Sequence, residues 1–159
     1  MSYICVNQKQ VMKTYIDTSV FGGYFDSEFE IPTKHFFIEI DKGYKIPIVS
    51  DLTVKELTGA PEKVKDLFNK YIKKIELVTV EDEMYELAND YLKNKALSPK
   101  YISDALHVAT ATILKIDVIV SWNFKHIVNL NRIRVFNGIN IKNGYNLIEI
   151  RTPKEVLNF

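Results

Sequence analysis

The chain has 159 residues, a net charge of +1 and 47% hydrophobic residues, and this length and apolar content predict one globular domain. No apolar run approaches the roughly 18 residues that a membrane-spanning helix needs, and the first residues lack the apolar middle of a signal peptide. Cys5 is the only cysteine, which excludes an intramolecular disulfide and a zinc site built from thiolates. These features predict a cytoplasmic protein without a membrane partner.

Short β-rich segments alternate with longer helical patterns along the chain. In chain order, we expect strands at residues 14–16, 46–50, 75–80, 118–121 and 147–150. Helices are expected near residues 32–43, 52–58, 61–74, 81–95, 99–115 and 123–137. Because parallel strands need long crossovers, the alternation predicts an α/β fold, a three-layer α/β/α sandwich with a mostly parallel sheet. Without internal linkers or repeats, we expect one domain over residues 14–159 after an N-terminal extension, residues 1–13.

Charge is unevenly distributed although the total is close to zero. Residues 16–62 contain nine acidic residues against four lysines, a net charge of −5, whereas residues 115–154 contain seven basic residues against two acidic ones, a net charge of +5. The asymmetry is explained either by a solvated surface or by an acidic centre that needs cations, with a basic margin that meets phosphates.

Three acidic residues and one amide stand out by their places in this pattern. Asp17 follows the first expected strand and Asn123 follows the fourth, so both are expected at the carboxyl edge of the sheet. Glu56 lies in the helix after the second strand, and Asp104 lies in a helix of small and apolar residues. Helix capping by Asp17 and Asn123, and an exposed position for Glu56, are the alternative interpretations; Asp51 is interpreted as a helix cap.

The helix expected at residues 99–115 has the clearest pattern. Ser98 is expected to cap it and Pro99 to occupy its first turn. Asp104 and His107 are one turn apart, so they share a side of this helix. A carboxylate among small apolar residues must be paired, hydrogen-bonded or metal-bound.

Convergence of these three acids would create a cation site. Two unit charges about 4 Å apart repel by roughly 4 kcal/mol at an effective dielectric constant near 20. Protonation of one acid, added basic groups or a divalent cation would relieve this repulsion. Oxygen ligands without cysteine favour Mg²⁺ or Mn²⁺ over zinc, and such an ion can polarise a phosphodiester and activate a water molecule.

Four segments, in this order, resemble the motifs of the PIN-domain nucleases, especially the VapC-type toxins. They are "YIDTSVFGGYFD", "SDLTVKEL", "SDALHVATA" and "VSWNFKHI". The key positions 17, 56, 104 and 123 are separated by 39, 48 and 19 residues, and the resemblance covers Tyr15 to about Ile150. The departure from the family pattern is Asn123, a neutral amide where an acid is common, which puts two-metal occupancy in doubt.

The resemblance implies a PIN-like sandwich fold and a metal-dependent endoribonuclease, the toxin of a toxin–antitoxin pair, that forms a homodimer and binds an antitoxin protein. Asp17, Glu56 and Asp104 would then hold Mg²⁺ or Mn²⁺, and Asn123 would complete the catalytic group. Ser19 would hydrogen-bond within the acidic cluster and contact the substrate. The sequence leaves open which RNA is cut.

The flanking residues have more than one interpretation. Lys125 and His126 are expected to contact substrate phosphates, against the alternative of ordinary surface charge. Trp122 either stacks on a base or belongs to the core, and Gly22 and Gly23 are interpreted as a permissive turn.

Two other functions are considered. A catalytically weak PIN-like module that binds RNA or a protein is favoured by Asn123. A haloacid-dehalogenase-like phosphatase also has an aspartate after its first strand, but Ser19 stands where its second aspartate would be.

Overall fold

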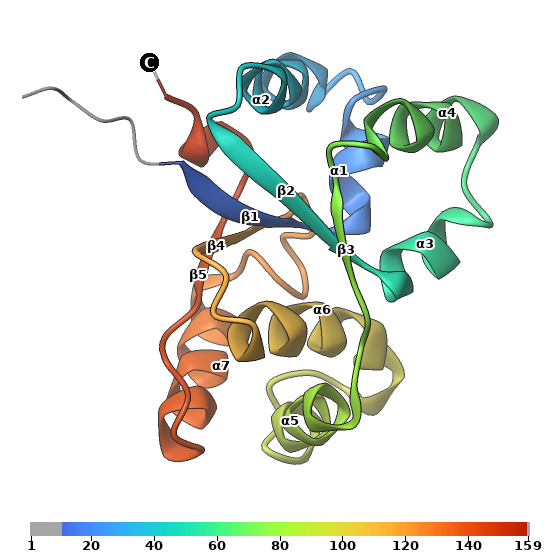
Figure 1. The fold of residues 1–159 in the computed structure, drawn as a ribbon. Coiled ribbons are helices and arrows are strands. Elements are labelled where there is room, and N and C mark those ends of the chain that lie inside the picture. The colour runs from blue at the N-terminus through green and yellow to red at the C-terminus, as the bar shows by residue number, and fades with distance from the viewer. Residues whose placement is uncertain (1–10, 159) are drawn as a thin grey trace, which may run out of the picture.

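A central parallel sheet separates two layers of helices in the computed structural model, which describes residues 11–158 (Figure 1). The sheet has five strands in the order β3-β2-β1-β4-β5, and every neighbouring pair is parallel. The strands are β1 (Met12–Ile16), β2 (Lys45–Ser50), β3 (Glu76–Val78), β4 (Val118–Val120) and β5 (Glu149–Arg151). The predicted three-layer α/β/α sandwich is confirmed.

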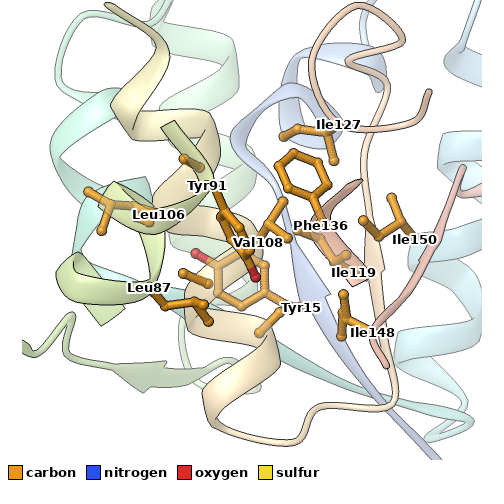
Figure 2. Close-up of a cluster of buried hydrophobic side chains, with 14 of the residues drawn as sticks. Tyr15, Leu87, Tyr91, Leu106, Val108, Ile119, Ile127, Phe136, Ile148 and Ile150 are labelled. Atoms are coloured by element: carbon orange, nitrogen blue, oxygen red, sulfur yellow. The ribbon is translucent and has the colours of Figure 1, made fainter. Parts of the chain in front are cut away.

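Alternate residues of the inner strands enter different cores, because successive side chains of a strand point to opposite faces. Tyr15 and Ile119 pack into the core beneath α5, α6 and α7, which Figure 2 shows with its buried aromatic and aliphatic side chains. Ile16 and Val120 pack into the opposite core. Burial of both faces explains why the inner strands β2 and β4 are predominantly apolar.

Helices on the two faces come from different parts of the chain. One layer contains α1 (Thr18–Gly23), α2 (Glu30–Asp41), α3 (Asp51–Leu57) and α4 (Glu62–Tyr71). The other contains α5 (Asp82–Lys93), α6 (Ile102–Ile113) and α7 (Leu130–Lys142). Short 3₁₀ helices occur at Pro99–Tyr101 and Lys154–Val156. Of the helices at residues 11–158, none is both long and apolar enough to span a membrane.

The largest differences from the sequence predictions are the start of α7 and the presence of α1. The helix expected from residue 123 begins at Leu130, because the Asn123 side chain accepts a hydrogen bond from the backbone N–H of His126 and closes a turn. Asn129 then caps α7 by accepting from the backbone N–H of Arg132. The helix α1 was not predicted: Gly22 and Gly23 lie inside it, so their interpretation as a turn was wrong. Its six residues are too few to show helical periodicity.

The predicted N-terminal extension lies largely outside the described residues. Within the described part, Met12 and Lys13 pair with Lys45 and Ile46 of β2, so these two residues belong to the sheet.

Candidate functional site

The candidate site lies between β1 and β4, where the order of the strands in the sheet changes direction. After β1 the chain adds β2 and β3 on one side, and β4 and β5 lie on the other side. Ile16 pairs with Val120, and the backbone N–H of Asp17 donates to the Val120 carbonyl over 3.0 Å. Residues after β1 and β4 therefore meet at the topological switch point, where ligands bind in open parallel sheets.

Asp17 is buried at this point, with only 4% of its surface exposed. Its Oδ2 atom accepts hydrogen bonds from the hydroxyls of Ser19, over 2.6 Å, and Ser121, over 2.8 Å. The backbone N–H of Ser19 donates to the same oxygen over 3.4 Å, so Asp17 is also the N-cap of α1. The capping and site interpretations of Asp17 are therefore compatible, since Oδ2 serves the cap and Oδ1 faces α6.

The helix α6 presents Asp104 and His107 to Asp17 from the other side of the site, as their one-turn spacing predicted. The Oδ2 atom of Asp104 lies 2.9 Å from Nδ1 of His126, and its Oδ1 atom accepts a hydrogen bond from the side-chain amide of Asn123 over 3.4 Å. Burial raises the pKa of Asp104, and the negative charge of Asp17 raises it further. These two influences outweigh the nearby histidines, so the site disfavours a second negative charge.

His107 is completely buried and joins the acids to the core. Its Nε2 atom lies 2.6 Å from Oε1 of Glu56 and 3.5 Å from Oδ1 of Asp17. On the other side of the ring, Nδ1 lies 2.7 Å from the Tyr15 hydroxyl, which is 2.8 Å from the Ser50 hydroxyl. A continuous polar chain therefore runs from Glu56 through His107 and Tyr15 to Ser50.

Opposite pKa shifts accompany the pairing of His107 and Glu56. Burial is the largest influence on His107 and lowers its pKa, but Tyr15, Glu56 and Asp17 together raise it well above the ordinary value. For Glu56, burial raises the pKa, but His107 and the Thr18 hydroxyl, 2.9 Å away, outweigh it and lower the pKa. Both shifts favour the charged form of the pair, an imidazolium beside a carboxylate.

The four predicted catalytic residues come from four separate segments and form two neighbouring contact groups. Asp104 contacts Asn123 directly, and Glu56 and Asp17 are joined through His107. Ser19 hydrogen-bonds within the cluster, as the family resemblance implied. Lys125 is exposed beside the cluster. His126 is buried, and its Nδ1 atom turns toward Asp104, so the structure gives it a role in orienting Asp104.

Sequence reasoning missed His107, Tyr15 and Ser121 as members of the site. The one-turn spacing of His107 from Asp104 was a usable signal for its place in the site. Ser121 directly follows β4, as Asp17 follows β1, and its hydroxyl bonds Asp17. Tyr15 carried no signal, because a tyrosine in a buried strand is usually core.

Whether Asp17, Glu56 and Asp104 can hold a metal ion together depends on the hydrogen bonds and ion pairs that their carboxylates already make. Across residues 11–158, no three or more histidine, cysteine or acidic side chains are grouped so that they could hold a metal ion together. Glu56 is instead paired with His107 and Thr18. Asp17 and Asp104 still fit a hard dication, since Mg²⁺ commonly uses one or two carboxylates and keeps several waters, and the raised pKa of Asp104 marks charge repulsion that a cation would relieve.

Asp51, which was interpreted as a helix cap, is not the cap of α3. Ser50 occupies that position, and Asp51 is the first helical residue. Its Oδ1 atom accepts from the backbone N–H of Val80 over 3.1 Å, so it ties α3 to the segment after β3.

Gly23 makes room for Trp122 at the margin of the site. A Cβ atom at Gly23 would lie 2.6 Å from Cδ1 and 2.7 Å from Nε1 of Trp122, whereas one at Gly22 would meet nothing within 4 Å. We expect Gly23→Ala to lower the free energy of unfolding by about 1–3 kcal/mol, the usual cost of overpacking. Gly22→Ala, in the same helix, should instead be neutral or stabilising by up to about 1 kcal/mol. Urea denaturation of both variants measures the difference, and equal stabilities would contradict the contact.

Comparisons with known proteins place the fold but not the family. No family model and no curated protein matches the chain. Among solved structures, the chain is similar to one in the crystal structure of VapBC2 from Rickettsia felis bound to a DNA fragment from their promoter, with a TM-score of 0.54 and 14% identity over 72% of this chain and 90% of the other. It is also similar to a chain of FitAcB from Neisseria gonorrhoeae, with a TM-score of 0.54 and 13% identity over 88% of this chain and 97% of the other. The chain therefore shares its fold with chains in these two assemblies.

Proposed function

We propose that this protein is a divalent-metal-dependent endoribonuclease that hydrolyses RNA phosphodiester bonds, the toxin of a toxin–antitoxin pair. The observation that carries the proposal is the meeting of Asp17 and Asp104 at the switch point of a parallel sheet, where Asp17 is buried, Asp104 is partly buried, and the charge of Asp17 raises the pKa of Asp104. The resemblance of the chain to PIN-domain nucleases supports this function, because the same two positions are acids of the family motifs.

The proposed cofactor is Mg²⁺ or Mn²⁺, held by Asp17 and Asp104, with Glu56 nearby. When bound, such an ion neutralises charge on a phosphodiester and lowers the pKa of a coordinated water. The residues of this chain position the ligands: Ser19 and Ser121 fix Asp17 through Oδ2, and His126 and Asn123 orient Asp104. His107 supplies a positive charge between Glu56 and Asp17. Lys125, exposed next to this group, is proposed to contact a phosphate.

An antitoxin protein and a second copy of the chain are the proposed partners, and the cytoplasm is the proposed location. The two structural neighbours are toxin–antitoxin complexes, which supports a partner of this kind. Sedimentation of the purified chain, alone and coexpressed with the product of an adjacent gene, tests both partners.

Metal-dependent cleavage of a labelled single-stranded RNA tests the function directly. We expect the parent protein to cut the RNA in millimolar Mn²⁺ or Mg²⁺, to stop when a chelator is added in excess, and to recover when the metal is restored. A preparation of the Asp17→Asn variant, purified in parallel, controls for contaminating ribonuclease. Cleavage that persists in chelator, or that is equal in both preparations, would contradict the proposal.

Asn123→Asp tests the position where the chain departs from the commoner acid of the family. The substitution removes the amide that donates to Asp104 and adds a carboxylate beside it. We expect the variant to be less stable than the parent in chelator, by a few kcal/mol at most under the screened Coulomb estimate. It should gain more thermal stability from millimolar Mn²⁺, because cation binding stabilises only the folded state. Paired melting curves measure both effects, and an equal Mn²⁺-induced shift in parent and variant would exclude Asn123 from the metal site.

A second function is a catalytically weak module that binds RNA or a protein through the same surface. The observation that favours it is that His107 already neutralises Glu56, so the three acids are not grouped around one point. Absence of cleavage in either metal, together with no Mn²⁺-induced shift in melting temperature, would select this second function over the nuclease.

A further inference from the structure

Three aromatic rings form a shelf beside the acidic cluster. We name Phe29, Trp122 and Phe124 the aromatic shelf. Phe29 stacks on Trp122 with ring centroids 4.4 Å apart and an interplanar angle of 20°. Phe124 lies against both, with its centroid 6.1 Å from each of the other two rings. Although these rings touch one another, Phe124 remains 48% exposed, so packing within the chain uses only part of its surface.

The shelf is rigidly joined to the candidate site. The backbone N–H of Trp122 donates to the Ser19 hydroxyl over 2.9 Å, and that hydroxyl donates to Asp17. The indole N–H of Trp122 donates to the Thr33 hydroxyl over 2.9 Å, which fixes the ring against α2. Phe124 directly follows Asn123, which contacts Asp104. The exposed ring is therefore connected to Asp104 through Asn123, and to Asp17 through Trp122 and Ser19.

Positive charges accompany the aromatic residues at this margin. Lys125 follows Phe124 and is exposed. Two further lysines lie over aromatic residues that precede Phe29 in the chain: the Nζ atom of Lys34, in α2, lies 5.5 Å from the centroid of the Tyr24 ring, and that of Lys63, in α4, lies 5.2 Å from the centroid of the Phe25 ring. An exposed lysine that directly follows an exposed aromatic residue, as Lys125 follows Phe124, suits a ligand that carries both phosphates and planar bases.

We propose that Phe124, supported by Trp122 and Phe29, stacks an unpaired nucleobase of a single-stranded RNA and thereby places the adjoining phosphodiester at Asp17 and Asp104. This inference rests on the proposed function, since it names the substrate class of the same site. A paired base presents no free face to a protein ring, so the shelf selects single strands or loops over duplexes.

A protein partner fits the shelf less well than a base does. Specific protein interfaces bury about 800 Å² on each partner, far more than three rings of which two are half-buried. A base needs only one ring face, which the exposed Phe124 provides, and the exposed Lys125 next to it in the chain is available for a phosphate.

The experiment uses Trp122 as its own reporter, because it is the only tryptophan of the chain. In chelator, which prevents cleavage, the parent is titrated with a six-residue oligouridylate, with an abasic oligonucleotide of the same charge, and with a blunt RNA duplex. We expect the oligouridylate to change the Trp122 fluorescence and to bind more tightly than the other two. Phe124→Ala should weaken this binding about 5- to 150-fold, the loss that removal of one base-stacking ring produces, while Phe124→Trp restores it.

Tyr85→Ala is the matched control, because Tyr85 is 46% exposed on α5, in the opposite layer of helices. It should bind the oligouridylate as the parent does. Equal affinity of the parent for the oligouridylate and the abasic strand would overturn the proposal, as would equal affinity of Phe124→Ala and the parent. A change of oligomeric state in Phe124→Ala with unchanged RNA binding would also overturn it and would assign the shelf to contact between two copies of the chain.

Failure of the shelf and failure of the nuclease function give different results. If only the shelf is wrong, Asp17-dependent cleavage occurs and Phe124→Ala has an unchanged KM for single-stranded RNA. If only the nuclease function is wrong, the oligouridylate binds in a Phe124-dependent manner and no metal produces cleavage.

Discussion

Asp17→Asn is expected to lower metal-dependent RNA cleavage at least about 100-fold, the loss typical when one group that stabilises transition-state charge is removed. The fold should survive, because an amide oxygen in place of Oδ2 can still accept from the hydroxyls of Ser19 and Ser121. Initial rates on a labelled single-stranded RNA in Mn²⁺ measure the effect. Asp66→Asn, which changes an exposed acid of α4, is the matched control and should retain the activity of the parent.

Asp104→Asn should lose activity to the same extent while gaining stability in chelator. The pKa of Asp104 is raised by burial and by Asp17, which means that the ionised form costs folding free energy at neutral pH. A neutral amide removes that cost, so the melting temperature without metal should equal or exceed that of the parent. Unfolding of both asparagine variants in chelator, where the parent stays folded, would show that these acids are structural and would contradict the site.

His107→Leu is expected to cost about 3 kcal/mol of folding stability, the low end of the cost of breaking a buried ion pair. The leucine leaves Glu56 and Asp17 without their cationic neighbour and leaves the Tyr15 hydroxyl with Ser50 alone. The estimate is at the low end because 31% of the Glu56 side chain is exposed and keeps part of its hydration. Urea denaturation in chelator measures the loss.

The control for this variant is His35→Leu, an exposed position on α2 that should change stability little. Adding Glu56→Gln to His107→Leu removes the unpaired charge and should recover part of the lost stability. If His107→Leu and His35→Leu unfold at the same urea concentration, the polar chain through His107 does not hold the site together.

Most helices and strands could be predicted from the sequence, because buried apolar residues recur at regular spacings along each element. The five strands were predicted near their observed positions, and the apolar character of β2 and β4 follows from burial on both faces of a parallel sheet. Boundaries set by side-chain caps were harder to predict. The start of α7 depends on Asn123 and Asn129, two amides that each close a local turn, and periodicity does not report such bonds.

For the site, the sequence by itself determined that acids follow the central strands and that Asp104 and His107 share a side of α6, because these relations are local in the chain. Only the tertiary structure decided which groups pair. His107 bonds Glu56, 51 residues away, and Tyr15, 92 residues away, while Asp104 bonds His126. Such pairing depends on how helices from different crossovers pack on the sheet and on which rotamers that packing allows. Local spacing does not encode that arrangement.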